Sequence, residues 1–224
     1  MICKHNNCYR EDINMTKIQE ISNAVEKGKA KLIKELVQEA LDTGENAADI
    51  LNEMTEVMGV VGEKFQAKQI FVPEMLIAAK TMKQGVEVLQ PHLKGTNTNK
   101  YGKFILGTVA GDLHDIGKNL VGLMVESAGF EVIDLGVDVP PEKFVEAIRE
   151  NPDCKLVGLS ALLTTTMGAL RNTIEVLDAA GCRDQVKIMV GGAPVTQSFA
   201  NDIGADAYAL DAGAAAVKAK ELVA

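Results

Sequence analysis

The chain has 224 residues, enough for one large domain or two small ones, and 47% of them are hydrophobic, so it can bury a core. A formal net charge of -8 and the lack of a basic stripe argue against a nucleic-acid partner. No apolar run approaches the ~20 residues that span a bilayer, no signal-peptide core opens the chain and the four cysteines are dispersed, so we expect a cytoplasmic protein with no membrane partner.

Residues 1–15 are polar and show no periodicity, so we expect a tail there. Cys3, His5 and Cys8 lie within this segment. Their types could suit a metal, but a fourth ligand is lacking nearby, and a tail is the better interpretation of the segment.

From residue 16 to residue 93 the apolar residues recur at helical spacing. Gly28 and Gly44 end the first two stretches, and Pro73 suits the first turn of the fourth. Four amphipathic helices with short connections predict a helical bundle over residues 16–93. Methionines in the later stretches are expected to fill its core rather than to bind a metal. The expected apolar positions include Leu32, Ile33, Val37, Met54, Met58, Met75, Leu76 and Met82.

Residues 94–102 are polar and contain glycine, which is typical of a linker. Over residues 103–224 short apolar runs alternate with helical stretches. Five such units predict an α/β domain with a parallel, doubly wound sheet. The expected strands are Phe104–Val109, Glu131–Leu135, Leu156–Leu159, Ile188–Val190 and Ala207–Leu210, and the expected helices lie near residues 117–128, 141–150, 166–180, 195–203 and 213–223.

The loop after the first expected strand carries Asp112, His114 and Gly117. A β–α junction is the usual place for ligand chemistry in an open α/β sheet. A histidine that binds a metal through one ring nitrogen needs its other nitrogen held, usually by a carboxylate, and Asp112 is close enough in sequence to do this. Gly117 removes a side chain where the helix begins. Taken alone, the pattern also fits a loop in which Asp112 caps the helix and His114 is merely exposed.

A longer match favours ligand chemistry, because the segment GDLHDIGKNLVG resembles the cobalamin-binding loop of the methionine synthase and corrinoid-protein family. The resemblance implies cobalamin as the cofactor, with His114 replacing the cofactor's own benzimidazole as the lower ligand of cobalt. It implies Asp112 as the hydrogen-bonded partner of that histidine, contacts from Asp115 and Ile116, and Gly117 as the opening for the nucleotide tail. It also implies a flavodoxin-like strand order, 2-1-3-4-5, with the ligand crevice between strands 1 and 3.

Two later loops carry groups that suit the same ligand. The loop SALLTTTM follows the third expected strand, and a Gly-Gly pair follows the fourth. Taken alone, hydroxyl clusters before helices are usually N-caps and Gly-Gly is usually a turn. In the family that this chain resembles, the matching loops line the cavity of the buried benzimidazole, which implies Ser160, Leu162, Thr164, Gly191 and Gly192. Methionine synthase continues its histidine–aspartate pair to a serine; the matching residue here is Thr166, whose extra methyl leaves the third member of the relay open.

The stretch EKFQAKQIFVPEMLIAAKTMKQGVEVLQP is similar to the helical cap that precedes the cobalamin domain in the same family. There, two apolar residues lie over the upper face of the corrin ring and shield the methyl group on cobalt. The matching positions are Phe65 and Val72, which would otherwise be predicted as ordinary core residues. The resemblance therefore implies a helical cap over residues 16–93 and a cobalamin-binding domain over residues 103–224.

The chain resembles, over nearly its whole length, the stand-alone corrinoid proteins of methanol, methylamine, betaine or aryl methyl ether metabolism. This implies a methyl carrier, base-off and His-on, that cycles between Co(I) and methyl-Co(III). The implied partners are a substrate-specific methyltransferase and an acceptor methyltransferase that uses tetrahydrofolate or a thiol, with a reductive activase as a further partner. No residues remain for the ~250-residue barrel that commonly holds such substrates, so we expect no catalysis by this chain alone, and its status as an enzyme stays open.

Other functional classes fit these residues less well. A cobalamin-based sensor would need a basic DNA-binding helix and usually a tryptophan in the cap, whereas this chain is acidic and has no Trp. Cobalamin-dependent mutases share the histidine loop but pair it with a barrel. Gly107, Gly111 and Gly117 do not match the G-x-G-x-x-G of nicotinamide or flavin domains, and a phospho-acceptor domain would not explain the helical cap. The sequence identifies neither the methyl donor nor the methyl acceptor.

Overall fold

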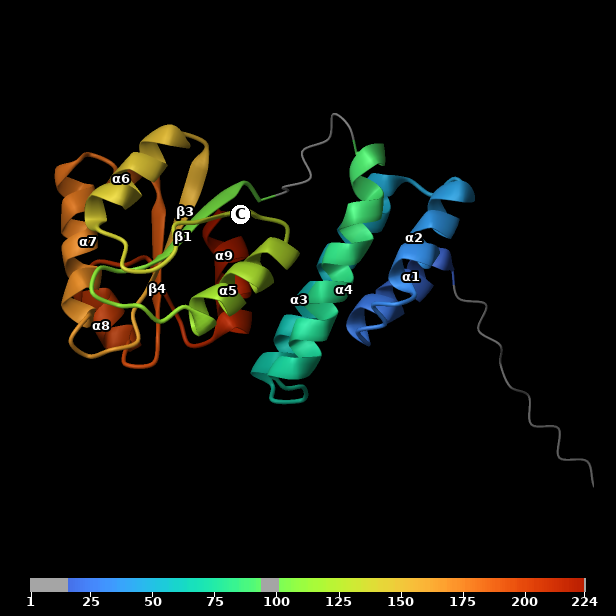
Figure 1. Ribbon diagram of the computed structural model, residues 1–224, viewed down its shortest axis with the longest axis horizontal. Coiled ribbons are helices and arrows are strands. Elements are labelled where there is room, and N and C mark those ends of the chain that lie inside the picture. Colours follow the sequence, from blue (N-terminus) through green and yellow to red (C-terminus); the bar gives the residue numbers. More distant parts are fainter. Residues whose placement is uncertain (1–15, 94–100, 224) are drawn as a thin grey trace, which may run out of the picture.

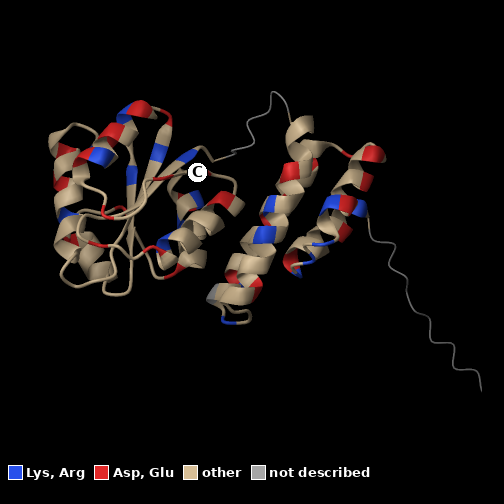
Figure 2. Cartoon of the chain, viewed as in Figure 1, with Lys and Arg blue, Asp and Glu red and all other residues tan. Residues whose placement is uncertain are grey.

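The computed structural model describes residues 16–93 and 101–223, which form a helical part followed by an α/β part (Figure 1). The expected tail with Cys3, His5 and Cys8 lies outside the described residues, as do residues 94–100 of the expected linker. None of the described helices is long and apolar enough to cross a membrane. Acidic and basic residues are interspersed along the elements of both parts (Figure 2).

The helical part confirms the expected four-helix bundle, and local sequence explains where its helices begin. Thr16 and Gln19 form a capping box at the start of the first helix, and the Asn46 side chain accepts a hydrogen bond from the Ala48 N–H at the start of the third. Gly28 follows the first helix with φ +64°, a conformation that favours glycine. The elements are α1 (Lys17–Glu26), α2 (Ile33–Asp42), α3 (Ala47–Gln66), α4 (Val72–Leu89) and a 3-10 turn, η1 (Gln90–His92).

Two of the residues expected in the core of this bundle are exposed instead, so these two predictions are wrong. Leu32 precedes α2 as its N-cap and is 48% exposed, and Leu76 on α4 is 39% exposed. Periodicity placed both on the apolar stripe, but each lies at the edge of the face that packs. The four methionines are buried as expected: Met54, Met58, Met75 and Met82.

The α/β part is a five-stranded parallel sheet in the order β2-β1-β3-β4-β5, which confirms the doubly wound arrangement. The element ends lie within two residues of those expected, and Val109, Leu135 and Leu210 fall just outside their strands. The strands are β1 (Lys103–Thr108), β2 (Glu131–Asp134), β3 (Cys154–Ser160), β4 (Lys187–Gly191) and β5 (Ala207–Ala209). The helices are α5 (Ile116–Ser127), α6 (Pro141–Glu150), α7 (Met167–Ala179), α8 (Gln197–Asp202) and α9 (Ala212–Val223), with a 3-10 turn, η2 (Arg183–Gln185).

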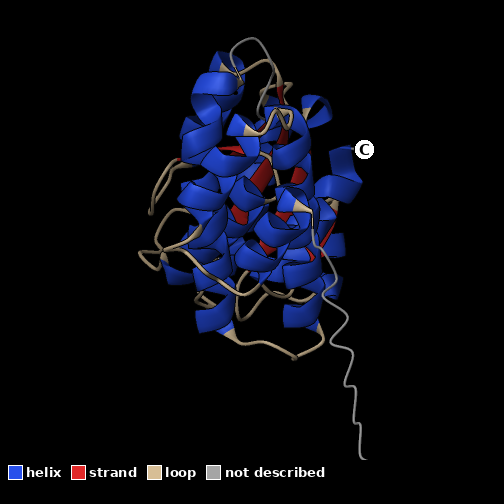
Figure 3. Cartoon of the chain, turned by 90° about the vertical axis from the view of Figure 1, so that its right-hand side faces the viewer, coloured by secondary structure: helices blue, strands red, loops and turns tan. Residues whose placement is uncertain are grey.

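Helices cover both faces of the sheet, and the two faces have separate hydrophobic cores. Helices α6, α7 and α8 lie on one face, while α5 and α9 lie on the other, between the sheet and the helical part (Figure 1). The core on the α5 and α9 side continues from Phe104 and Leu106 of β1 into the four-helix bundle. Seen from the side of the bundle, helices cover the strands (Figure 3). The bundle therefore packs onto the α/β part through buried apolar surface.

Candidate functional site

A cavity of about 650 Å³ lies at the carboxyl ends of the central strands, where an open α/β sheet usually binds its ligand. The loop after β1, the ends of β3 and β4, the last turn of α3 and the first residue of α4 all contribute to its wall. Most of the residues predicted for the site line this cavity: Phe65, Val72, His114, Asp115, Ile116, Gly117, Ser160, Leu162, Gly191 and Gly192. Segments far apart in the sequence therefore converge on one space.

A hydrogen bond to Asp112 holds one nitrogen of the His114 ring, and the His114 side chain lines the cavity. Its Nδ1 lies 2.7 Å from Asp112 Oδ1, and its side chain is 51% exposed. An ionised carboxylate can only accept, so Nδ1 carries a proton, and in the neutral ring Nε2 is the nitrogen with the lone pair. The backbone is held as well, because the His114 N–H donates to Asp112 Oδ1 at 3.1 Å and Thr108 Oγ1 donates to the His114 carbonyl at 2.9 Å. The arrangement presents Nε2 as a metal ligand.

Asp112 is fully buried, and hydrogen bonds hold both of its carboxylate oxygens. Oδ2 accepts from the Leu162 N–H at 2.7 Å, the Leu163 N–H at 3.3 Å and Thr166 Oγ1 at 2.7 Å. Burial by itself raises the pKa of Asp112, but the hydrogen bonds from Thr166, His114 and the Leu162 backbone outweigh it. The pKa therefore lies well below its ordinary value of 3.8, and the carboxylate stays ionised beneath the imidazole.

Thr166 reaches Asp112 despite the methyl group that distinguishes it from serine. Its hydroxyl lies 2.7 Å from Asp112 Oδ2 and 2.9 Å from the Leu163 carbonyl, which compete for its single proton. The methyl points toward Gly111, where a Cβ would lie 3.6 Å from it. The chain His114–Asp112–Thr166 is thus present in the structure as a continuous hydrogen-bonded series.

Glycines let the loops after β3 and β4 approach each other at backbone distance. A Cβ on Gly192 would lie 1.8 Å from the Ala161 carbonyl oxygen, and Gly192 has φ +128°. A Cβ on Gly191 would lie 3.0 Å from the carbonyl oxygen of Ala209. Thr164 belongs to the same region but is exposed and does not line the cavity, so the structure does not bring it together with the other predicted residues.

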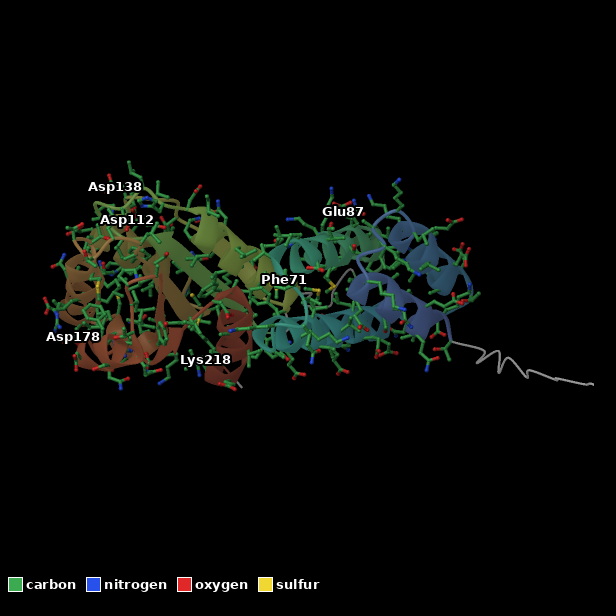
Figure 4. All side chains as sticks on the ribbon, turned by 90° about the horizontal axis from the view of Figure 1, so that it is seen from below. Phe71, Glu87, Asp112, Asp138, Asp178 and Lys218 are labelled. Atoms are coloured by element: carbon green, nitrogen blue, oxygen red, sulfur yellow. The ribbon has the colours of Figure 1, made fainter. Side chains whose placement is uncertain are left out.

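Apolar side chains surround the mouth of the cavity. Leu113, Ile116 and Leu210 are 71%, 85% and 76% exposed, which is unusual for large apolar groups gathered in one place. Phe65 and Val72 line the cavity from the helical side, and their neighbour Phe71 lies between the two parts (Figure 4). A flat, largely apolar ligand would cover this surface.

Lys118 is a residue of the cavity wall that the sequence did not single out. Its side chain is 2% exposed, donates to Asn119 Oδ1 at 2.7 Å and forms an ion pair with Asp134 at the end of β2. A lysine beside Gly117 looks like any surface lysine on a helix. Its burial depends on Asp134, which is 16 residues away, so local sequence carries no signal for it.

The donor set fits a metal that is already held in an organic macrocycle. The cavity offers one imidazole nitrogen in a largely apolar wall, whereas a bare ion such as zinc takes three or four protein ligands. Within the described residues no group of three or more His, Cys, Asp or Glu side chains could hold a metal ion. The site thus combines one imidazole held in place by a carboxylate, a glycine-lined slot and an apolar rim.

Comparison with known proteins identifies relatives with this layout. A B12 binding domain family matches residues 102–220, and a second B12 binding domain family matches residues 17–90. The dimethylamine corrinoid protein 2 of Methanosarcina acetivorans is 46% identical over 208 residues, which are 92% of this chain and 95% of that protein.

Two solved structures share the fold over most of the chain. A cobalamin-binding protein from Desulfitobacterium hafniense superposes with a TM-score of 0.79 and 31% identity, over 92% of this chain and 98% of that one. The methanol:cobalamin methyltransferase complex MtaBC of Methanosarcina barkeri contains a chain with a TM-score of 0.80 and 28% identity, over 92% of this chain and 79% of that one.

Proposed function

This chain belongs to the B12-binding corrinoid proteins, and we propose that it holds its corrinoid through His114 Nε2 in place of the cofactor's own base. It is a corrinoid methyl carrier of methyltransferase systems, as its sequence resemblance predicted. When bound, the corrinoid supplies a cobalt centre that accepts a methyl group in its reduced form and gives it up to an acceptor.

The single observation that carries the proposed ligation is the hydrogen bond between His114 Nδ1 and the buried Asp112. It fixes the tautomer in which Nε2 is unprotonated, and it makes the ring a better donor. Were the ring released from the metal, Nε2 would be free to accept a proton. Asp112 would stabilise the resulting imidazolium because its own pKa stays low, held there by Thr166 and the backbone of Leu162.

The remaining residues of the cavity position the ligand and limit access to it. Ser160, Leu162 and the two glycines after β4 bound the slot that would take the nucleotide tail. Phe65 and Val72 come from the helical side and would cover the face opposite His114. We propose that these side chains keep water from the reactive face while the cap is closed.

Methylated amines are the proposed class of methyl donor. Relatives that cover most of this chain are named dimethylamine and trimethylamine corrinoid proteins, at 46% and 42% identity. A substrate-specific methyltransferase would load the carrier, and a second methyltransferase would pass the group to a thiol or to tetrahydrofolate. A screen of mono-, di- and trimethylamine and methanol with a co-purified methyltransferase tests the donor.

The ligation is tested by the substitution His114→Ala in protein reconstituted with cobalamin. We expect the variant to bind cobalamin, with a changed visible spectrum and slower methyl transfer, because Nε2 no longer reaches the metal. His92→Ala is the matched control, since that histidine lies at the far end of the bundle. A spectrum of His114→Ala that equals the wild-type spectrum would contradict ligation by this residue.

A further inference from the structure

Asp138 does not line the cavity, yet it holds the backbone on both sides of Asp112. Its Oδ1 accepts a hydrogen bond from the Gly111 N–H at 2.7 Å, and its own N–H donates to the Asp112 carbonyl at 2.9 Å. Figure 4 places Asp138 and Asp112 together at the same end of the α/β part. One residue of the loop between β2 and α6 thus bonds to two successive residues of the histidine loop.

The conformation of Asp138 is special, and its neighbours anchor it to the sheet. Among the described residues other than glycine, only Asp138 and Lys68 have a positive φ, and that of Asp138 is +53°. Aspartate enters this left-handed region more readily than most residues do. On either side, the Val139 N–H donates to the Thr108 carbonyl at 2.9 Å and the Thr108 N–H donates to the Gly136 carbonyl at 3.0 Å. The loop that carries Asp138 is therefore an extension of the sheet rather than a free loop.

Two separate loops therefore hold Asp112 through hydrogen bonds. The loop after β3 holds its carboxylate through Leu162 and Thr166, and Asp138 holds its main chain. The His114 ring is attached to that carboxylate at 2.7 Å. A shift of the backbone at residues 111–112 would change the direction in which the imidazole points.

We propose that Asp138 is a positioning residue, which sets the direction of the His114 imidazole by holding the main chain around Asp112. The role of this position in cobalt binding rests on the proposed ligation by His114. Asp138 acts through Asp112 and the main chain, and it touches neither the imidazole nor the cavity.

Three substitutions of Asp138 separate its two contributions, the acceptor oxygen and the positive-φ backbone conformation. Asp138→Asn keeps an oxygen acceptor and tolerates positive φ, Asp138→Gly keeps the backbone conformation but loses the acceptor, and Asp138→Ala loses both. Asp178→Ala, which removes an exposed acid on α7 at another edge of the molecule (Figure 4), is the matched control. Hydrogen exchange of the unloaded protein is measured over residues 109–115, and the apparent Kd and visible spectrum are measured with added hydroxocobalamin.

We expect Asp138→Asn and Asp178→Ala to behave like the wild-type protein in every measurement. Asp138→Gly should exchange about fivefold faster over residues 109–115 and bind hydroxocobalamin about fivefold more weakly, the size of effect that loss of one hydrogen bond produces. Asp138→Ala should show the larger change of the two. Exchange in α9, which contains none of the substitutions, should stay unchanged in all variants, which checks that they fold.

The proposal is overturned if Asp138→Gly matches the wild-type protein in loop exchange or in Kd. It is also overturned if Asp138→Asn loses as much as Asp138→Gly, because the acceptor oxygen would then have no role. Should Asp138→Gly fail to fold, Asp138→Ser replaces it; its shorter side chain loses the acceptor position and its Cβ is strained at positive φ, so its loss should equal that of Asp138→Ala. Since loop exchange is read without the corrinoid, it stays informative even if His114→Ala proves the proposed ligation wrong.

Discussion

The two walls of the cavity belong to parts of the molecule that pack in different ways, the α/β part and the helical bundle. On the α/β side, backbone packs against backbone: a Cβ on Gly192 would lie 1.8 Å from the Ala161 carbonyl oxygen. Behind the helical wall, Gly85, the glycine of α4, is buried inside the bundle and faces the end of a methionine, with a Cβ 2.4 Å from Met54 Cε. Backbone cannot move out of the way, whereas a methionine can change rotamer. The rigid wall lies in the part that positions His114, and the other wall, with Phe65 and Val72, lies in the more adaptable part.

Gly192→Ala tests the rigid wall and should have the largest effect. The new methyl meets a carbonyl oxygen, and φ +128° strains any residue with a Cβ. We expect the free energy of unfolding to fall by about 3–5 kcal/mol, from overpacking and backbone strain together. Urea denaturation of the unloaded protein measures this.

Gly204→Ala is the control for Gly192→Ala, because its φ of +74° is also positive but no atom lies within 4 Å of the added Cβ. Its free energy of unfolding should fall by only about 1 kcal/mol, from backbone strain alone. Equal losses in the two variants would mean that the backbone contact at Ala161 is not tight, and the comparison of the two walls would fail.

Asp112→Ala tests the polar network of the same wall. It leaves the Leu162 N–H and the His114 N–H without their acceptor at a largely buried position, while Thr166 Oγ1 keeps only the Leu163 carbonyl as its acceptor. We expect a loss of about 3 kcal/mol in the free energy of unfolding, because unpaired buried donors cost more than a lost bond. Asp178→Ala, an exposed acid, should change stability by less than about 0.5 kcal/mol. A comparably small loss for Asp112→Ala would show that the network does not hold the loop.

Gly213→Ala tests the contact between the two walls. Its Cβ would lie 3.0 Å from Phe65 Cδ1 and 3.3 Å from the Gly62 carbonyl oxygen, so α9 would push against α3. We expect a loss of about 1 kcal/mol and faster hydrogen exchange in α3. Gly168→Ala, with no atom within 4 Å of the new Cβ, should leave α3 unchanged. Unaltered exchange in the Gly213 variant would mean that this contact does not fix the position of the bundle.

Gly85→Ala should have the smallest effect on the free energy of unfolding, and with its matched variant it gives the sharpest comparison of the helical part with the α/β part. Alanine favours the helix by about 0.5–1 kcal/mol over glycine, which offsets the movement of Met54, so the net change should stay within about 1 kcal/mol. The matched variant is Gly158→Ala, whose Cβ would lie at the same 2.4 Å distance from Phe104 Cζ, in an aromatic ring of the sheet core. That variant should lose about 1–3 kcal/mol. Equal losses would show that both walls are equally rigid.

Much of the fold could be predicted because its signals are local. Helical periodicity located the four helices, and the alternation of strands and helices identified the α/β class. The strand order came from the resemblance to a family, since periodicity carries no information on which strands pair. The misplaced Leu32 and Leu76 show the limit of periodicity, which gives the apolar face but not how far the neighbouring helix covers it.

The candidate site likewise contains residues that a local motif predicts and residues that only the fold brings to it. The motif located His114, Asp112 and Gly117, which stand within six residues of one another. Thr166 lies 54 residues from Asp112, and only the fold shows that its hydroxyl reaches the carboxylate in spite of the extra methyl. Thr164, predicted from the family's cavity-lining loop, is exposed and does not line the cavity.

By itself, the sequence determined the helical and α/β classes, the corrinoid family and the imidazole that faces the cavity, because periodicity and a contiguous motif are properties of neighbouring residues. Only the tertiary structure decided three other features. Asp138 forms hydrogen bonds with the main chain around Asp112, and Lys118 is buried against Asp134. Gly192 allows the loops after β3 and β4 to come into backbone contact. Those features join residues that lie far apart in the chain. Their distances are set by how the strands and helices pack, which no local pattern encodes.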